Sequence, residues 1–223
     1  MTRTTNARIA GFTFLLYIAA GITSLVVWGK ASGGDDIVAR LTSIAQHPGA
    51  VGATVLLLLV QAFSALVLGV TLFALTCDVD RDLATLGMVC RIVEGVIGGA
   101  GIASTPALVA LASAAGESAS DPAATHVLAA HLLRGEGTLT ATFFAVGSLL
   151  FSWLLVRGRL IPVAMAWLGV IASALLVLVL PLQLAGFLHG IVTQIVWAPM
   201  LAFEVPLGVW MMVKGVRNPS GNE

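Results

Sequence analysis

The sequence predicts an all-α fold, a polytopic transmembrane bundle of six helices that forms one domain over residues 1–223. Composition and hydropathy both predict it. Of the 223 residues, 58% are hydrophobic and only 10% are charged, whereas soluble domains carry about 25% charged residues. The mean hydropathy is +1.01. A water-soluble fold would leave much of this apolar sequence on its surface, so the composition indicates an integral membrane protein.

Six apolar segments are long enough to cross the hydrocarbon layer, which takes about 20 helical residues. Leu, Ala, Val and Gly dominate these segments, and they lack the alternating pattern of membrane strands, so we predict helices. The predicted spans are residues 9–28, 51–76, 83–112, 137–156, 160–182 and 191–213. Short connections join them, so we expect no separate soluble module.

The first span is predicted to be retained in the protein, and a short helix is predicted to follow it. Residues 9–28 lack a small-x-small cleavage site followed by polar sequence, so we interpret them as a retained helix and not as a signal peptide. In the following GGDDIVARLTSIAQHPG, Asp35 or Asp36 can cap a short helix. Three apolar side chains would share one face of this helix, namely Ile37, Leu41 and Ile44.

A second short connecting helix is predicted before the fourth span. In SASDPAATHVLAAHLLRGEG, Asp121 can cap this helix and Pro122 suits its first position. Both connecting helices belong to the outer side of the predicted bundle. We expect them to lie in the membrane interface as amphipathic connectors, and the alternative is a lid over an outward-facing cavity.

Basic residues are distributed unequally between the two sides, which predicts that both termini are cytoplasmic. The cytoplasmic side then holds Arg3, Arg8, Arg81, Arg157, Arg159, Lys214 and Arg217, and the outer side holds Lys30, Arg40 and Arg134. The net charge is zero and no further basic cluster exists, so we exclude nucleic acid and expect membrane lipids as partners. Cys77 and Cys90 lie toward the reducing cytoplasmic side, so no disulfide is expected.

Three charged residues lie deep inside predicted spans. At about 1.5 Å per helical residue, Arg91 lies ~14 Å from the cytoplasmic end of its span, Glu94 one turn deeper, and Glu204 ~15 Å from the end of the last span. The hydrocarbon layer is about 30 Å thick, so all three are near its middle. Tyr17 and Gln61 fall within a turn or two of this level. Each charge at this depth costs ~2.5–3.5 kcal/mol, so we expect none of them to face lipid singly.

The simplest arrangement of these charges is one polar cluster that joins the third and sixth spans. Arg91 and Glu94 share a helix face at a spacing of three and can pair, and Arg91 is the only buried cation near Glu204. One arginine against two carboxylates leaves an excess negative charge, so we expect one glutamate to carry a proton at neutral pH. The candidate general acids are Glu204 and Glu94, and the candidate ligand-binding residues are Arg91, Tyr17 and Gln61.

The sixth span carries further signals of a binding site around Glu204. Pro199 and Pro206 each remove a helical N–H and free a carbonyl one turn earlier, which predicts a kinked helix. Such irregular backbone is tolerated in a membrane only where protein or a wet cavity satisfies it. Trp197 shares the helix face of Glu204, and it is a further candidate ligand-binding residue.

Several motifs along the chain together carry a resemblance to a known family. They are Ala7-Arg8-Ile-Ala-Gly11, Arg91-Ile-Val-Glu94, Arg157-Gly-Arg159-Leu-Ile-Pro162 with Trp167-Leu-Gly169-Val, and Phe203-Glu204 leading to Gly208-Val-Trp210-Met-Met-Val-Lys214-Gly215. They resemble an uncharacterised bacterial family of six-helix membrane proteins, domain-of-unknown-function family 4386. The resemblance covers nearly the whole chain. It implies a multi-pass protein of the bacterial inner (cytoplasmic) membrane and directs attention to the charged cluster, but it implies no reaction.

The remaining constellations predict no metal site and no cofactor. His126 and His131 are five residues apart, which places them about 140° apart around a helix rather than on one face. Asp78, Asp80 and Asp82 alternate in a cytoplasmic loop but lack the glycine and the terminal glutamate of a calcium loop. We interpret this acidic segment as a solvated turn.

Three classes of function remain open for the charged cluster. The first is a pocket that binds a small lipophilic molecule, such as an isoprenoid or quinone-like compound, with or without converting it by acid–base chemistry. The second is a structural role, in which the buried charges hold the bundle together or join it to a second copy or a partner subunit. The third is a proton-coupled carrier with Glu204 on a mobile helix. The sequence shows no nucleophile with an adjacent base, so it names no reaction.

Overall fold

The computed structural model describes residues 1–116, 122–134 and 137–217, and these residues form helices and turns without any strand. The helices are α1 (Arg3–Ala31), α2 (Ile37–Gln46), α3 (Pro48–Thr76), α4 (Arg81–Gly101), α5 (Ser104–Gly116), α6 (Pro122–Arg134), α7 (Gly137–Arg157), α8 (Val163–Leu184), α9 (Val192–Ile195) and α10 (Ala198–Val213). Within the described residues, six helical segments are long and apolar enough to cross a membrane. The predicted all-α, six-span membrane fold is confirmed.

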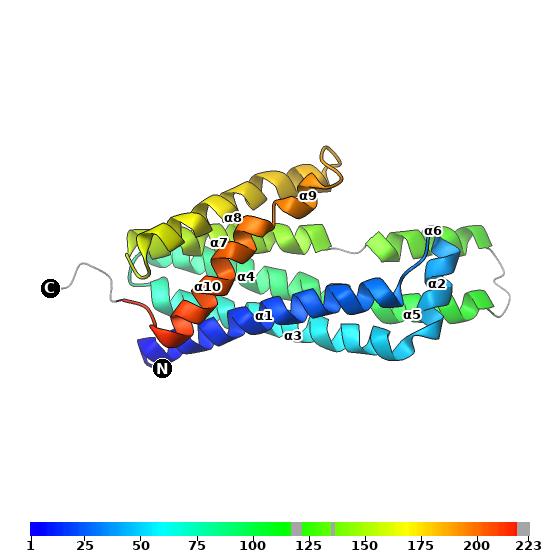
Figure 1. Cartoon of the computed structure of the whole chain (residues 1–223), viewed down its shortest axis with the longest axis horizontal. Coiled ribbons are helices and arrows are strands. Elements are labelled where there is room, and N and C mark those ends of the chain that lie inside the picture. Colours follow the sequence, from blue (N-terminus) through cyan, green and yellow to red (C-terminus); the bar gives the residue numbers. More distant parts are fainter. Residues whose placement is uncertain (117–121, 135–136, 218–223) are drawn as a thin grey trace.

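The six membrane-crossing segments form a closed ring in the order of the chain. α1 packs on α3, α3 on α4, α4 on α7, α7 on α8, α8 on α10, and α10 returns to α1. Figure 1 shows the long helices side by side, with α10 crossing them obliquely and both termini at one end. We call this the terminus end of the bundle and the opposite one the far end. The ring surrounds one continuous core, whose central members include Phe144 and Phe203.

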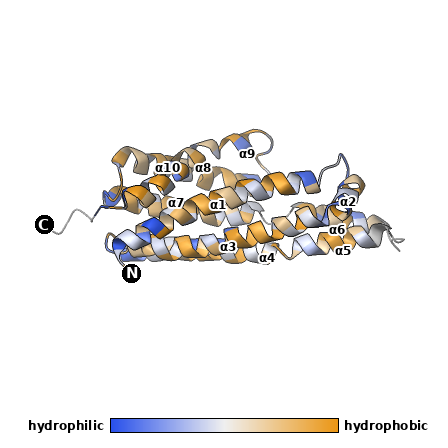
Figure 2. Cartoon of the chain, turned by 60° about the horizontal axis from the view of Figure 1, so that its bottom comes forward, coloured by the Kyte–Doolittle hydropathy of each residue, from blue (hydrophilic) through white to orange (hydrophobic). Residues whose placement is uncertain are grey.

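The outer surface of the ring is apolar, as a helix bundle in lipid requires. Figure 2 shows hydrophobic residues covering the sides of the long helices. Large side chains such as Phe63 and Ile171 are mostly exposed there, at 63% and 62% of their full surface. In water this would be a very large exposed apolar patch, whereas hydrocarbon covers it at no cost.

The connecting helices α2, α5 and α6 form a second helical layer at the far end, which we call the cap. In Figure 1, α5 and α6 continue the long direction of the bundle and α2 stands across it. The cap has its own small core, which includes Leu41, Ile44 and Ala129. The Asp36 carboxylate caps α2 by accepting a 2.7 Å hydrogen bond from the Ala39 N–H, as predicted. The connecting helices therefore pack on one another. Asp121, the predicted cap of the second connecting helix, lies outside the described residues.

Two predicted spans are interrupted. The third was predicted to be continuous over residues 83–112, but α4 ends at Gly101 and α5 begins at Ser104. Pro106 has no N–H for the carbonyl of Ile102, which favours an interruption of the helix at this point. In the last span, Pro199 lies in the first turn of α10, after a break at Val196 and Trp197 that separates α9. Pro199 thus starts a helix, where we predicted a kink within one.

Loops at the terminus end are joined by polar contacts. Arg157 pairs with Asp80 at 2.8 Å and Arg3 pairs with Asp78 at 3.4 Å, so the acidic turn between α3 and α4 contacts both α7 and α1. Asp80 also caps α4 by accepting from the Leu83 N–H at 3.2 Å. Exposed pairs of this kind contribute only ~0–1 kcal/mol each. They orient the loops, and burial in the ring holds the fold.

Candidate functional site

The three charged residues that the sequence places at mid-depth meet inside the ring. Arg91 is 1% exposed, Glu94 is 2% exposed and Glu204 is 4% exposed. Arg91 and Glu94 lie on α4, and Glu204 reaches them from α10 on the other side of the interior. Chain segments more than one hundred residues apart therefore form one buried ionic cluster.

Glu94 is held on both of its carboxylate oxygens. Its Oε2 atom lies 2.9 Å from Arg91 Nη1, and the Tyr17 hydroxyl of α1 donates a 2.7 Å hydrogen bond to its Oε1 atom. The contact with Arg91 is close in distance but is not aligned as a hydrogen bond. The structure therefore places Tyr17 in the cluster as a hydrogen-bond donor to Glu94.

The Tyr17 hydroxyl gives a direct test of this geometry. Tyr17→Phe keeps the ring but leaves one oxygen of a buried carboxylate without a donor. Hydrogen bonds to charged groups contribute about 1.5–3 kcal/mol, so we expect the free energy of unfolding to fall by about this amount. Unfolding in mixed micelles, followed by circular dichroism, measures the change. Equal stability of the variant would show that the Tyr17 hydroxyl does not stabilise Glu94.

Aromatic rings cover the guanidinium of Arg91. Its Cζ atom lies 5.2 Å from the centre of the Tyr17 ring and 5.1 Å from that of Phe144. The two rings are parallel to within 3°, with centres 6.2 Å apart, and Trp197 continues the row 5.8 Å beyond Phe144. We call Tyr17, Phe144 and Trp197 the aromatic row. Cation–π contacts in such a dry site contribute ~2 kcal/mol, which offsets part of the cost of burying Arg91.

Two glycines make room for the Arg91 side chain. A Cβ atom added to Gly69 of α3 would lie 3.1 Å from Arg91 Cβ, and one added to Gly147 of α7 would lie 3.2 Å from Arg91 Cδ. These separations are tighter than ordinary carbon contacts, so larger residues would push the arginine out of place. The two glycines let α3 and α7 close around the charge.

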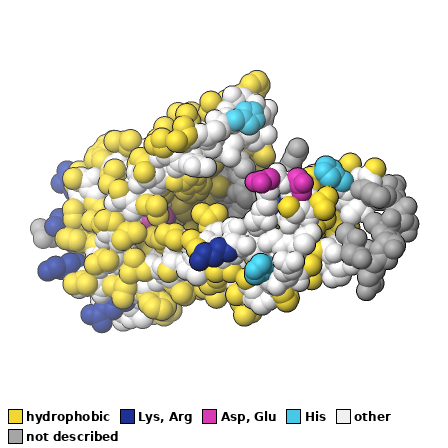
Figure 3. Space-filling model, turned by 45° about the vertical axis from the view of Figure 1, so that its right-hand side comes forward, with side chains coloured by type: hydrophobic (Ala, Val, Ile, Leu, Met, Phe, Trp, Pro, Cys, Tyr) yellow, Lys and Arg dark blue, Asp and Glu magenta, His cyan; other side chains and the backbone are white. Residues whose placement is uncertain are grey.

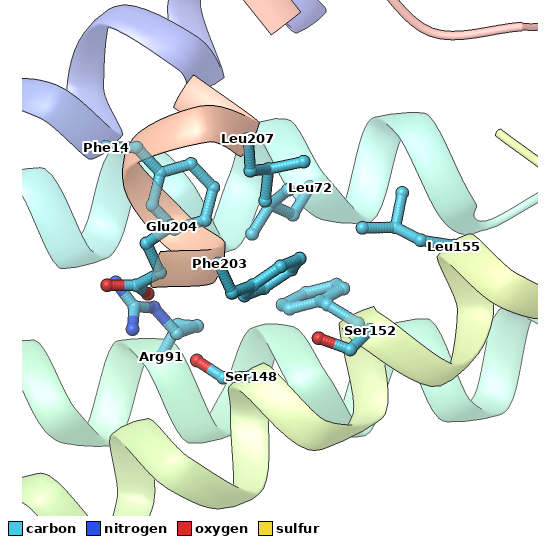
Figure 4. Close-up of a pocket in the computed structure, with 10 residues that line it drawn as sticks. Phe14, Leu72, Arg91, Ser148, Ser152, Leu155, Phe203, Glu204 and Leu207 are labelled. Carbon is cyan, nitrogen blue, oxygen red and sulfur yellow. The ribbon is translucent and has the colours of Figure 1, made fainter. Parts of the chain in front are cut away.

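Figure 4 shows a small pocket beside Arg91. Its lining residues on α7 and α10 follow Phe144 and Trp197 in the chain, so the pocket lies on the terminus side of the aromatic row. Its lining consists of Phe14, Leu72, Arg91, Ser148, Phe151, Ser152, Leu155, Phe203, Glu204 and Leu207. The cavity has a volume of about 10 Å³. That is the space of about one water molecule. The pocket is mostly apolar, and its polar groups come from α4, α7 and α10.

Arg91 has hydrogen-bonding capacity that the described residues do not use. Its Nε and Nη2 atoms are buried without an acceptor. Figure 4 shows the Glu204 carboxyl turned toward the guanidinium, but no salt bridge joins the two in the described part of the chain. We predicted one cluster of all three charges. Arg91 and Glu94 pair directly, whereas Glu204 shares the pocket without a direct pair.

The other predicted site residues are placed differently from one another. Trp197 belongs to the aromatic row, two helical turns before Glu204. Gln61 does not join the cluster, because its amide packs against Gly21 on α1, about one turn beyond Tyr17. The count of helical turns gave Gln61 nearly the right depth but could not give the direction of its side chain.

Two polar residues of the pocket were not predicted from the sequence. Ser148 and Ser152 of α7 line it with their hydroxyls, and both are buried. One signal could have found them, because two serines four residues apart share a face of an otherwise apolar span at the depth of Arg91. Phe144, one turn before Ser148, lies on the same face and belongs to the aromatic row.

Fold and site together define a multi-pass helical membrane protein with an ionic cluster buried at mid-depth. The chain belongs to the family described as a domain of unknown function (DUF4386), whose family model matches residues 9–215. The resemblance that the motifs predicted is confirmed. Comparison with curated proteins gave no match, and comparison with solved structures gave none either.

The motifs that carried the resemblance lie against one another in the fold. Gly11 meets Gly208 where α1 crosses α10, and Gly169 of α8 meets the ring of Phe203. At the terminus end, the Arg217 N–H donates a 2.9 Å hydrogen bond to the carbonyl of Leu160. Glu204 lies directly after Phe203 and one turn before Gly208, so these contacts position its carboxyl in the pocket.

Proposed function

We propose that the protein binds a small lipophilic molecule within the membrane and holds its polar head group at Arg91. The observation that supports this most is that Arg91 lines a small buried pocket while its Nε and Nη2 atoms have no acceptor among the described residues. A buried donor without an acceptor costs about 1–3 kcal/mol, and more when it is charged. A ligand atom that accepts these hydrogen bonds would remove that cost.

The contacts divide the candidate roles between the two glutamates. Glu94 is engaged by Arg91 and Tyr17, so it orients the arginine. Glu204 lines the pocket and has no salt bridge in the described residues, so its carboxyl is the group free to exchange a proton with a ligand. General acid chemistry on a bound molecule would therefore belong to Glu204.

The lipophilic body of such a molecule needs more room than the pocket has, so binding requires a helix to move. α10 is the best candidate, because Pro206 interrupts its hydrogen bonds and it packs less extensively on α8 than on α1. Figure 3 shows the surface hollowed between the far end of α8 and α9 and the cap. α9 leads directly to Trp197, so a molecule entering from this hollow would meet the aromatic row first.

The proposal includes an orientation and a location. The terminus end carries most of the basic side chains, which Figure 3 shows on the left of the molecule. By the positive-inside rule this end faces the cytoplasm. We place the protein in the bacterial inner membrane, in contact with membrane lipids, with a second copy or a partner subunit as a further contact.

Copurification tests the proposed binding. We would extract wild type, Arg91→Lys and Arg157→Lys with organic solvent, matched for folded protein, and compare the extracts by mass spectrometry. Arg91→Lys keeps the charge beside Glu94 but removes the guanidinium edge, while Arg157→Lys makes the same chemical change in an exposed pair. We expect a discrete small molecule in wild type and in the control, depleted about tenfold or more in Arg91→Lys.

Other outcomes would favour the two alternative functions. Extracts that contain the same bulk phospholipid in all three proteins would contradict the ligand site and favour a structural role. Uptake into vesicles that depends on a proton gradient and is abolished by Glu204→Gln would favour the carrier. If Arg91→Lys does not fold, the double variant Ser148→Ala/Ser152→Ala keeps every charge and still alters the pocket.

A further inference from the structure

We infer that the head group held at Arg91 is an uncharged carbonyl oxygen, as in a lipophilic ketone or quinone. This inference rests on the proposed binding function and specifies its ligand class. Three features of the site support it: the shape of the free guanidinium edge, the size of the pocket and the balance of charge around it.

The free edge of Arg91 presents two parallel donors. Nε and Nη2 lie on the same side of the planar guanidinium, and neither has an acceptor among the described residues. Two parallel N–H groups bind acceptor oxygens with fixed geometry, either two oxygens of a carboxylate or phosphate or the two lone pairs of one carbonyl oxygen. The edge therefore requires an acceptor and repels a cationic head group such as an amine.

With α10 in its present position, the pocket that Arg91 lines has room for about one oxygen atom. The cavity volume of about 10 Å³ is enough for a single group the size of a water molecule. A carboxylate has two oxygens and a phosphate has at least three, so either head group has more oxygens than this pocket can hold. The apolar side chains of Phe151, Phe203 and Leu207 fill the rest of the lining, and they offer nothing to solvate further charge.

The charged groups around the pocket do not call for a ligand anion. Arg91 is neutralised by Glu94 at 2.9 Å, and Glu204 contributes a second carboxyl. No other basic side chain lines the pocket in the described part of the chain. An anionic head group would therefore add negative charge beside two carboxyl groups in a low-dielectric site, where unpaired charge is strongly disfavoured. A neutral carbonyl adds none.

The other polar groups of the pocket can also donate. The hydroxyls of Ser148 and Ser152 face it, and neither makes a hydrogen bond that the described residues show. A protonated Glu204 is a further donor. Donors on several sides suit an atom that only accepts, which is what a ketone or quinone oxygen does.

Four probes with matched chains test the head group on wild-type protein in lipid nanodiscs. They are methyl undecyl ketone, dodecanoate, dodecylamine and tridecane, and calorimetry measures saturable binding. We expect the ketone to bind about tenfold more tightly than each of the others. Ser148→Ala/Ser152→Ala is expected to weaken ketone binding about fivefold or more, because it removes neutral donors. Arg157→Lys, in the exposed pair with Asp80, is expected to leave it unchanged.

The possible results separate this inference from the proposed function. Tighter binding of dodecanoate or dodecylamine, lost in Arg91→Lys, would overturn the carbonyl assignment and leave the ligand site standing. Ketone binding that Arg91→Lys and the serine variant both leave unchanged would place the site elsewhere and overturn the assignment as well. Binding of no probe in a saturable way would overturn both, because the chains would then only partition into lipid.

Discussion

Arg91→Met is expected to lower the free energy of unfolding by about 3–5 kcal/mol, the largest loss we expect from a single side chain of the site. The substitution keeps most of the side-chain volume but leaves the Glu94 carboxylate buried without its cation. Breaking a buried ion pair from one side is costly, because the remaining charge has neither water nor a partner. Unfolding in mixed micelles, followed by circular dichroism, measures the change.

The double variant Arg91→Met/Glu94→Leu distinguishes the net contribution of the ion pair to stability from the cost of leaving one charge unpaired. Replacing both charges by apolar groups of similar size is often neutral or stabilising, so we expect it to recover most of the stability lost in Arg91→Met. Arg157→Met, which breaks the exposed pair with Asp80, is the control and is expected to cost no more than ~1 kcal/mol. A single variant as stable as wild type would contradict the ionised pair that we describe.

Gly11→Ala is expected to destabilise the bundle by ~1–3 kcal/mol or more, although it adds only one methyl group. A Cβ atom at Gly11 would lie 2.5 Å from the carbonyl oxygen of Gly208 and 2.8 Å from the backbone nitrogen of Met212. Both are backbone atoms, so no side-chain rotation relieves the contact and α1 must separate from α10. The thermal midpoint of purified protein in one detergent is the measurement.

Gly29 on the same helix provides the matched control. A Cβ atom there would meet nothing within 4 Å. Gly29→Ala should therefore be neutral or slightly stabilising, since alanine favours a helix over glycine by about 1 kcal/mol. Equal effects of the two substitutions would contradict the close crossing of α1 and α10. The crossing also bears on the site, because Gly208 lies one turn after Glu204 and fixes the approach of α10 to the pocket.

Depth in the membrane was the most productive quantity to derive from the sequence. Counting helical residues placed Arg91, Glu94 and Glu204 at one level, and the structure buries all three side chains inside the ring. The same count placed Tyr17 close enough to donate to Glu94. It works because a helix has a fixed rise per residue and the cytoplasmic ends of the two spans are marked by charge, at Asp82 and Lys214. It gives no rotation about the helix axis, which is why Gln61 was expected at the cluster and lies against Gly21 instead.

Helix interruptions were only partly predictable. Pro199 was recognised, but its effect was predicted as a kink and is instead a new start at Ala198. Pro106 was overlooked inside a long apolar run, although the missing N–H is a local property that ends α4 and begins α5. Hydropathy is averaged over many residues, so a single proline does not change it. A hydropathy profile therefore predicts one continuous span where the structure has two helices, α4 and α5.

By itself, the sequence determined the fold class, the six spans, the level of the buried charges and the family, because each depends on composition, helical rise or local motif. Only the tertiary structure decided the closed ring, the cap with its own core and the aromatic row over Arg91. It also decided that Glu94 contacts Arg91 and Tyr17 while Glu204 shares a pocket with Ser148 and Ser152. These features depend on which faces of distant helices meet, and in a uniformly apolar chain that choice is made by glycine contacts and side-chain shape, which no hydropathy pattern records.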